Sequence, residues 1–241
     1  MKAAGIPAVL LTMFLPAGGP AEAESPTSEI PWLTGTSKAM VAATESRSPI
    51  LVDLWAIWCE PCKVMEQTTY RDPRVVQAIS GLVPLKIDVD ADTVFAQRYE
   101  VEQYPTTLFM DGQGREITRL PGLVEAGPML EAIEVVRGGF GAYLEQVENR
   151  DDPAAMAEVG DYLLRAGNAD GALPLLRRAL KLMKGQPPEM TEGVELSRAE
   201  ALLESGRTGA AVKELERLSN SAADPEVRGR ADRVMERLGQ D

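Results

Sequence analysis

The segment LVDLWAIWCEPCKVME, residues 51–66, contains Cys59 and Cys62, the only two cysteines in a chain of 241 residues. It begins within the apolar run ILVDLWA, which only Asp53 interrupts, and such a run is typical of a strand buried on both faces. After the cysteines, Pro61 suits the first turn of a helix, because proline lacks an N–H group that would be unpaired there. The segment therefore predicts a buried strand, a turn with both cysteines, and a helix.

Two cysteines separated by two residues at a strand-to-helix junction are typical of thiol redox chemistry. The first sulfur lies where a helix N-terminus presents unpaired N–H groups, which stabilise a thiolate. We therefore expect Cys59 to attack a substrate disulfide and Cys62, one helical turn further, to resolve the mixed disulfide. The alternative is an inert structural disulfide, although so short a loop restrains little of the unfolded chain.

Strand and helix patterns alternate from Pro49 to Arg137. After the first strand and helix, the sequence predicts a strand, a helix, a hairpin and a helix, at residues 83–90, 92–101, 106–122 and 127–136. This order predicts a mixed α/β sheet covered by helices.

After Gly138 and Gly139 the strand patterns end and apolar residues recur at helical spacing. Residues 166–180 align with residues 205–219 at an offset of 39 residues, a period typical of stacked helical hairpins. The small residues Gly160, Ala172 and Ala179 resemble those of tetratricopeptide repeats, and residues 224–239 predict a closing helix. The alternative is an unrelated helical bundle packed on the first domain.

The segment LVDLWAIWCEPCK resembles the active-site strand and helix of the thioredoxin family. In this resemblance Asp53 matches the family's buried carboxylate, Trp55 and Trp58 its tryptophans, and Cys59 and Cys62 its thiol pair. The segments VMEQTTYRDPRVVQAI and MDGQGREI are most similar to the C-terminal thioredoxin domain of periplasmic thiol:disulfide interchange proteins.

Further matches lie downstream. Lys86 matches the lysine near the buried aspartate, Pro105 the cis-proline, and Gly122 the glycine after the last hairpin. The resemblance implies that Trp58, Tyr104, Pro105 and Thr106 form the substrate-binding surface. Pro105 would expose the backbone of Tyr104 to an extended substrate segment; the alternative is an ordinary edge-strand proline.

Asp53 is the expected general base. Its apolar neighbours should raise the pKa of its carboxyl group, so that it accepts and returns the Cys62 proton through water. The alternative is an aspartate bonded to backbone at a strand end.

Lys86 is expected to pair with Asp53 and adjust its pKa, or else to be solvated. Glu60, where thioredoxins have a small residue, should disfavour the Cys59 thiolate.

The composition excludes several functions. A net charge of -12 argues against nucleic-acid binding, because that binding relies on clustered basic side chains. With no histidine and only two cysteines, a zinc site would have to combine two thiolates with carboxylates, which is an uncommon ligand set, so we expect no metal and no cofactor.

The N-terminal sequence resembles a secretory signal peptide. Lys2 precedes the apolar residues 3–15, and Ala21-Glu22-Ala23 is a small-x-small cleavage site. The apolar stretch is shorter than the roughly 20 residues of a membrane-spanning helix, so we expect cleavage rather than an uncleaved anchor. The mature protein would then be periplasmic or secreted, without stable membrane insertion.

These patterns predict a signal peptide at 1–23, a thioredoxin-like α/β domain at 24–139, and a tetratricopeptide-like all-α domain at 140–241. The expected function is a thiol:disulfide oxidoreductase that acts on protein substrates and receives electrons from a membrane donor. The alternative is an adaptor, in which the helical repeats bind a protein partner and the thioredoxin fold is a docking scaffold. A basic cluster at Arg177, Arg178, Lys181 and Lys184 could meet an acidic partner segment or could be a solvated helix face.

Overall fold

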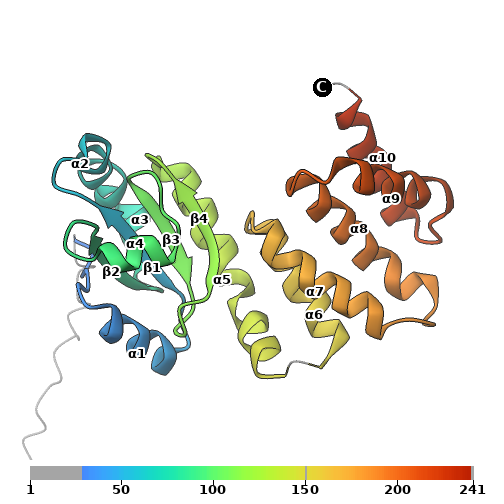
Figure 1. The fold of residues 1–241 in the computed structure, drawn as a ribbon, viewed down its shortest axis with the longest axis horizontal. Helices are drawn as coiled ribbons and strands as arrows, with labels where there is room; N and C mark the ends of the chain where they lie inside the picture. The colour runs from blue at the N-terminus through green and yellow to red at the C-terminus, as the bar shows by residue number, and fades with distance from the viewer. Residues whose placement is uncertain (1–28, 150, 240–241) are drawn as a thin grey trace, which may run out of the picture.

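The computed structural model describes residues 29–149 and 151–239. The predicted signal peptide and its cleavage site lie outside these residues. The described chain consists of an α/β domain followed by helices alone, as Figure 1 shows. This arrangement confirms the predicted fold class. Among the described residues, no helix combines the length and apolarity that crossing a membrane requires.

The α/β domain is built on a four-stranded sheet in the order β2-β1-β3-β4. The central strand β1 (Ile50–Trp55) runs parallel to β2 (Val83–Asp88) and antiparallel to β3 (Thr106–Met110). Strand β4 (Glu116–Pro121) pairs antiparallel with β3 and forms one edge. The mixed sheet predicted from the alternating patterns is therefore present, and β1 lies in its interior.

Helices cover both faces of this sheet. Because successive side chains of a strand point to opposite faces, Leu51 packs into one apolar cluster and Val52 into the other. The helices α1 (Thr36–Ser46) and α4 (Thr93–Arg98) cover the Val52 face. The Leu51 face is covered by α2 (Glu60–Gln67), α3 (Pro73–Ile79) and α5 (Ala126–Glu148), with the short 3-10 helix η1 (Thr69–Arg71) between α2 and α3.

The remaining helices form a unit that we call the helical module: α6 (Pro153–Arg165), α7 (Ala169–Leu182), α8 (Pro188–Glu204), α9 (Thr208–Ser221) and α10 (Pro225–Leu238). The predicted repeat is visible in its turns, because Gly167 and Gly206 both have left-handed φ angles, 78° and 76°. A Cβ atom at Gly160 would lie 2.6 Å from the Leu176 side chain, so α6 and α7 pack closely because residue 160 is small. Helix α10 confirms the predicted closing helix.

Helix α5 joins the two parts. The expected boundary at residues 139/140 lies inside this helix, which continues to Glu148. A Cβ atom at Gly139 would lie 2.1 Å from the ring of Tyr162 in α6, whose hydroxyl donates to the Val136 carbonyl at 3.0 Å. One apolar cluster runs from Phe109 in the sheet through α5 to Leu176 in α7. The parts therefore share a core, and the Gly138-Gly139 pair is a packing site within a helix.

The helical module also contacts the edge strand β4. The Asn168 side chain, in the turn before α7, donates to the Ile117 carbonyl at 2.8 Å, and the Thr118 hydroxyl donates to the Ala166 carbonyl at 2.5 Å. An edge strand otherwise leaves such groups open to unwanted pairing. The turn between α6 and α7 thus covers part of this edge.

Candidate active site

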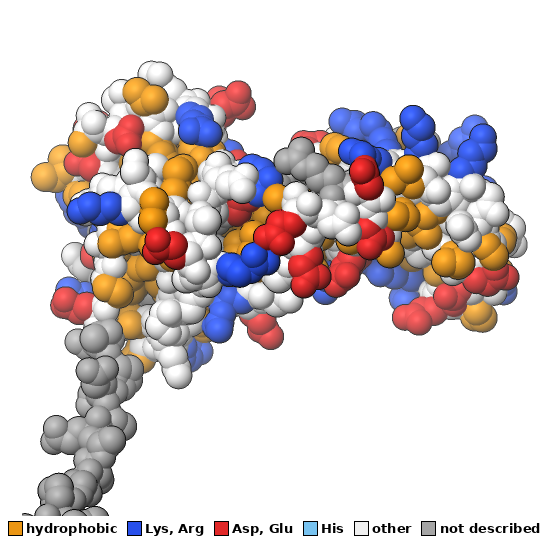
Figure 2. Space-filling view, turned by 90° about the horizontal axis from the view of Figure 1, so that it is seen from below, with side chains coloured by type: hydrophobic (Ala, Val, Ile, Leu, Met, Phe, Trp, Pro, Cys, Tyr) orange, Lys and Arg blue, Asp and Glu red, His pale blue; other side chains and the backbone are white. Residues whose placement is uncertain are grey.

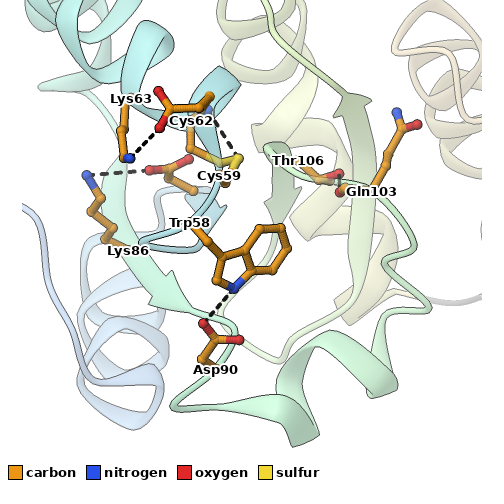
Figure 3. The surroundings of a disulfide bond; sticks show 10 residues. Trp58, Cys59, Cys62, Lys63, Lys86, Asp90, Gln103 and Thr106 are labelled. Atoms are coloured by element: carbon orange, nitrogen blue, oxygen red, sulfur yellow. Dashed lines mark hydrogen bonds and ion pairs between the residues drawn. A yellow bond between two sulfur atoms is a disulfide. The ribbon is translucent and has the colours of Figure 1, made fainter.

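Cys59 and Cys62 are joined by a disulfide bond with an S–S distance of 2.01 Å. Cys59 is the N-cap residue of α2, and its sulfur accepts a hydrogen bond from the Cys62 backbone N–H at 3.2 Å (Figure 3). Pro61 lies in the first turn, as expected. Both cysteines are buried, with exposed fractions of 3% and 6%. The Cys59 sulfur therefore lies at a helix N-terminus and has an N–H donor, the environment that favours a thiolate.

Asp53, on β1, is 3% exposed. Burial raises the pKa of its carboxyl group from 3.8 to about 6, although the Lys86 ammonium and the Tyr70 hydroxyl act in the opposite direction. The Lys86 Nζ lies 3.7 Å from the Asp53 Oδ2. The expected pairing of these two residues is therefore present, and Asp53 has a pKa suited to proton exchange near neutral pH.

Two further residues that affect the pKa of Asp53 were not predicted from the sequence. Tyr70, in η1, is 4% exposed, and its hydroxyl lies 3.2 Å from the Thr107 hydroxyl. Glu66, on α2, pairs with Lys86, and its charge contributes to the raised pKa of Asp53. The signal for Glu66 was its position seven residues after Cys59, which places it two helical turns along α2 on the same face. Tyr70 carried no comparable signal because η1 interrupts the helical periodicity.

The disulfide is flanked by an exposed aromatic side chain. Trp58 is 59% exposed, and its indole N–H donates to the Asp90 carboxylate at 2.8 Å. Its ring also packs edge-to-face against Tyr104, with ring centroids 6.0 Å apart. Figure 3 shows Trp58 between the disulfide and Asp90. These contacts fix the orientation of the Trp58 ring beside the reactive bond.

The Tyr104–Pro105 peptide bond is cis, as the resemblance implies. Pro105 and Thr106 are buried, and the Thr106 hydroxyl donates to the Gln103 carbonyl at 2.8 Å. The Thr106 side chain is thus occupied, so Thr106 would contact a substrate through its backbone. The substrate-binding roles of Trp58, Tyr104, Pro105 and Thr106 remain predictions.

Glu60 has a partner close to the cysteines. The Lys63 ammonium lies 2.6 Å from the Glu60 carboxylate, and both side chains are largely exposed. This cation offsets part of the negative charge that Glu60 places beside Cys59. Among the described residues, no three His, Cys, Asp or Glu side chains are grouped closely enough to hold a metal ion.

Two family models match the chain. Residues 36–137 match the model of a thioredoxin-like domain, and residues 163–231 match that of a tetratricopeptide repeat. The chain is 37% identical over 93 residues to the thiol:disulfide interchange protein DsbD of Pseudoalteromonas atlantica. The matched region covers 36% of this chain and 16% of that protein. It is 34% identical over 101 residues to the DsbD of Vibrio vulnificus, and this match covers 39% of this chain and 17% of that protein.

The chain is also similar to a solved structure. The oxidised C-terminal domain of Neisseria meningitidis DsbD is 26% identical with a TM-score of 0.39, and the match covers 43% of this chain and 97% of that one. The matches to the two curated DsbD proteins span about a sixth of the length of each. The chain thus contains a thioredoxin-like domain of the disulfide-oxidoreductase type, with its cysteine pair at residues 59 and 62, followed by a tetratricopeptide-repeat module.

Proposed function

We propose that this protein reduces or exchanges disulfides of protein substrates in the periplasm or another secretory compartment. The observation that carries the proposal is the position of the Cys59 sulfur at the N-terminus of α2, with the buried carboxyl group of Asp53 in the adjacent strand. Relatives that match the α/β domain are named as thiol:disulfide interchange proteins, and the signal-peptide-like N-terminus supports the compartment.

The reaction starts from the reduced dithiol. The Cys59 thiolate attacks one sulfur of the substrate disulfide, a mixed disulfide forms, and the first substrate thiolate leaves and takes a proton. Asp53 accepts the Cys62 proton through water, and the Cys62 sulfur then attacks Cys59. The Cys59–Cys62 disulfide forms, the second substrate sulfur leaves as a thiol, and two electrons have passed to the substrate.

The oxidised protein must then be reduced again. A membrane electron donor would supply the two electrons, since cytosolic reductants do not reach a secretory compartment. The substrate would bind to the surface around Trp58 and the cis-Pro105 loop. The helical module would recruit a protein partner, because stacked helical hairpins form extended binding surfaces and the module holds no cysteine of its own.

The direction of electron flow is tested by equilibrating the full chain with glutathione buffers and measuring the Cys59–Cys62 potential. A value near that of thioredoxin, about -270 mV, supports reduction of substrates, whereas a value near that of DsbA, about -120 mV, supports oxidation. Failure to catalyse reduction of insulin disulfides under any buffer condition would contradict the oxidoreductase proposal.

The adaptor alternative makes a different prediction. If the α/β domain were a docking scaffold, a Cys59→Ser, Cys62→Ser double variant would retain its function in cells that lack the native protein. We expect that variant to fail to restore function in these cells. Its melting temperature, compared with that of the reduced native chain, shows whether it remains folded.

A further inference from the structure

The helical module contains a groove of about 450 Å³ between the C-terminal half of α7 and the facing side of α8. We call it the basic groove, and its charged lining residues are Arg177, Lys181, Lys184, Glu195 and Arg198. Arg177 and Lys181 lie one turn apart on α7, and Lys184 follows in the turn that ends this helix. All three of these cations are exposed.

Two of the five charged side chains that line the basic groove are paired. Arg198 pairs with Glu214, and Glu195, the only carboxylate of the lining, pairs with Arg217. Arg177, Lys181 and Lys184, in contrast, have no carboxylate within ion-pair distance anywhere in residues 29–149 and 151–239. The groove therefore has uncompensated positive charge although the chain as a whole has a net charge of -12.

The charges of the helical module are separated on its surface. In the view of Figure 2, Lys and Arg side chains gather along one edge of the module, whereas Asp and Glu side chains gather on the other side. Like charges placed close together repel, and an oppositely charged partner removes this repulsion.

We propose that the basic groove binds an acidic peptide segment of a partner protein. This inference deepens the recruitment role proposed above and rests on it. Cations one helical turn apart are separated by about 5.4 Å along the helix axis. Alternate side chains of an extended peptide recur every 6.6 to 6.8 Å or so, which long basic side chains can match. The fitting segment is therefore extended and has Asp or Glu at alternate positions.

A membrane or nucleic acid fits these charges less well. Both present negative charge over areas much larger than the screening length of about 8 Å at physiological salt, so the acidic remainder of the chain is repelled. A short peptide, in contrast, is close only to the charges of the groove. The local excess of positive charge thus favours a short acidic segment.

The test is fluorescence anisotropy of a labelled ten-residue peptide with alternating Glu and Ser, mixed with the full chain. The groove variant is Arg177→Gln, Lys181→Gln, Lys184→Gln. The matched control, Lys38→Gln, Lys213→Gln, Arg233→Gln, removes the same charge from exposed positions outside the groove. We expect the groove variant to bind about tenfold more weakly, since each surface contact contributes roughly 0.5 kcal/mol. The control should bind as the native chain does.

Several results would overturn the inference: no binding of the Glu peptide by the native chain, equal affinity of the native chain and the groove variant, or an equal loss in the control. Binding to phosphatidylglycerol vesicles without binding to the peptide would assign the groove to a membrane instead. Insulin reduction by the same proteins reports the thiol chemistry separately. A groove variant that loses peptide affinity should keep full insulin-reducing activity, so the two proposals fail independently.

Discussion

Two carboxylates with the same exposed fraction, 3%, distinguish the two parts of the molecule. Glu192, in the helical module, accepts backbone N–H groups of Ala223 at 2.9 Å and Asp224 at 3.0 Å, one on each oxygen. Asp53, in the α/β domain, has its nearest cation 3.7 Å away and a pKa raised to about 6. Glu192 thus links α8 to the start of α10, whereas Asp53 can gain or lose a proton.

Burial alone therefore does not identify a functional carboxylate. Asp111 is even more buried, at 1%, yet it accepts hydrogen bonds from the Gln113 and Arg115 backbones and from the Arg115 and Tyr143 side chains. Several donors hold the oxygens of such a carboxylate in a fixed position. On this basis we place the proposed chemistry in the α/β domain and the proposed partner binding in the helical module.

Replacing either cysteine should have the largest effect on disulfide reduction. Cys59→Ser should abolish disulfide reduction, because the variant has no sulfur at the N-terminus of α2, and Cys62→Ser should accumulate a mixed disulfide with substrate. Non-reducing gel electrophoresis and mass spectrometry measure the trapped complex. A trapped complex with Cys59→Ser instead would reverse the two roles.

A smaller effect is expected for Asp53→Asn. Loss of the proposed general base should slow resolution of the mixed disulfide by about a hundredfold, within the usual range for acid–base catalysis. Glu192→Gln is the matched control, since it neutralises a carboxylate of equal burial far from the cysteines in sequence. It should leave the resolution rate unchanged, as measured by stopped-flow quenching of tryptophan fluorescence.

The same two variants should change stability in opposite directions. The folded pKa of Asp53, about 6, exceeds its ordinary value of 3.8, so the native state holds this proton more tightly than the unfolded chain. Its contribution to the free energy of unfolding therefore falls by about 2 to 3 kcal/mol as pH rises from about 4 to above 6.

In the Asp53→Asn variant, the free energy of unfolding should no longer fall as pH rises through this range. The variant should therefore be more stable than the native chain at pH 7.5 but not at pH 4. Glu192→Gln should destabilise by about 1 to 3 kcal/mol, because one backbone N–H loses a charged acceptor. Urea unfolding at both pH values measures these differences. Equal effects of the two variants at pH 7.5 would remove the distinction between the carboxylates.

The junction offers a comparison between neighbouring glycines. Gly139→Ala places a methyl group against the Tyr162 ring and should destabilise by about 1 to 3 kcal/mol. Gly138→Ala meets nothing within 4 Å and should stabilise by about 0.5 to 1 kcal/mol through helix propensity. Urea unfolding of both variants is the measurement. Stabilisation of both would show that Tyr162 does not pack on Gly139.

The smallest expected effects concern the neighbours of Asp53. Lys86→Gln should raise the pKa of Asp53, because a cation is lost, and Glu66→Gln should lower it, because an anion is lost. The pH dependence of the resolution rate would show both shifts. Shifts in the same direction would mean that Asp53 is not the group that titrates.

Much of the α/β domain was predictable from the sequence because its patterns are local. The apolar run of β1, the cysteine spacing and Pro61 all specify structure within a few residues. The 39-residue repeat was likewise visible, because its two turns need the same residue type at Gly167 and Gly206. The roles of the individual site residues stay predictions until the variants are measured.

What the sequence did not reveal depends on distant contacts. Helix α1 was missed because only Ala39 and Ala43 of its residues are buried, which is too small an apolar stripe to recognise. The length of α5 was underestimated because a Gly-Gly pair usually ends a helix, and the ring of Tyr162 that packs there comes from another helix. Tyr70 was missed for a similar reason, since its contact with Thr107 spans 37 residues.

The most direct test of the central claim is the rate of iodoacetamide alkylation of each cysteine in the reduced, full-length protein at pH 6, followed by mass spectrometry. We expect Cys59 to react faster than Cys62, because its sulfur lies at the N-terminus of α2, where the N–H groups stabilise a thiolate. In denaturant the two rates should become equal. Equal rates in the folded protein, or faster alkylation of Cys62, would contradict the assignment of Cys59 as the attacking thiol.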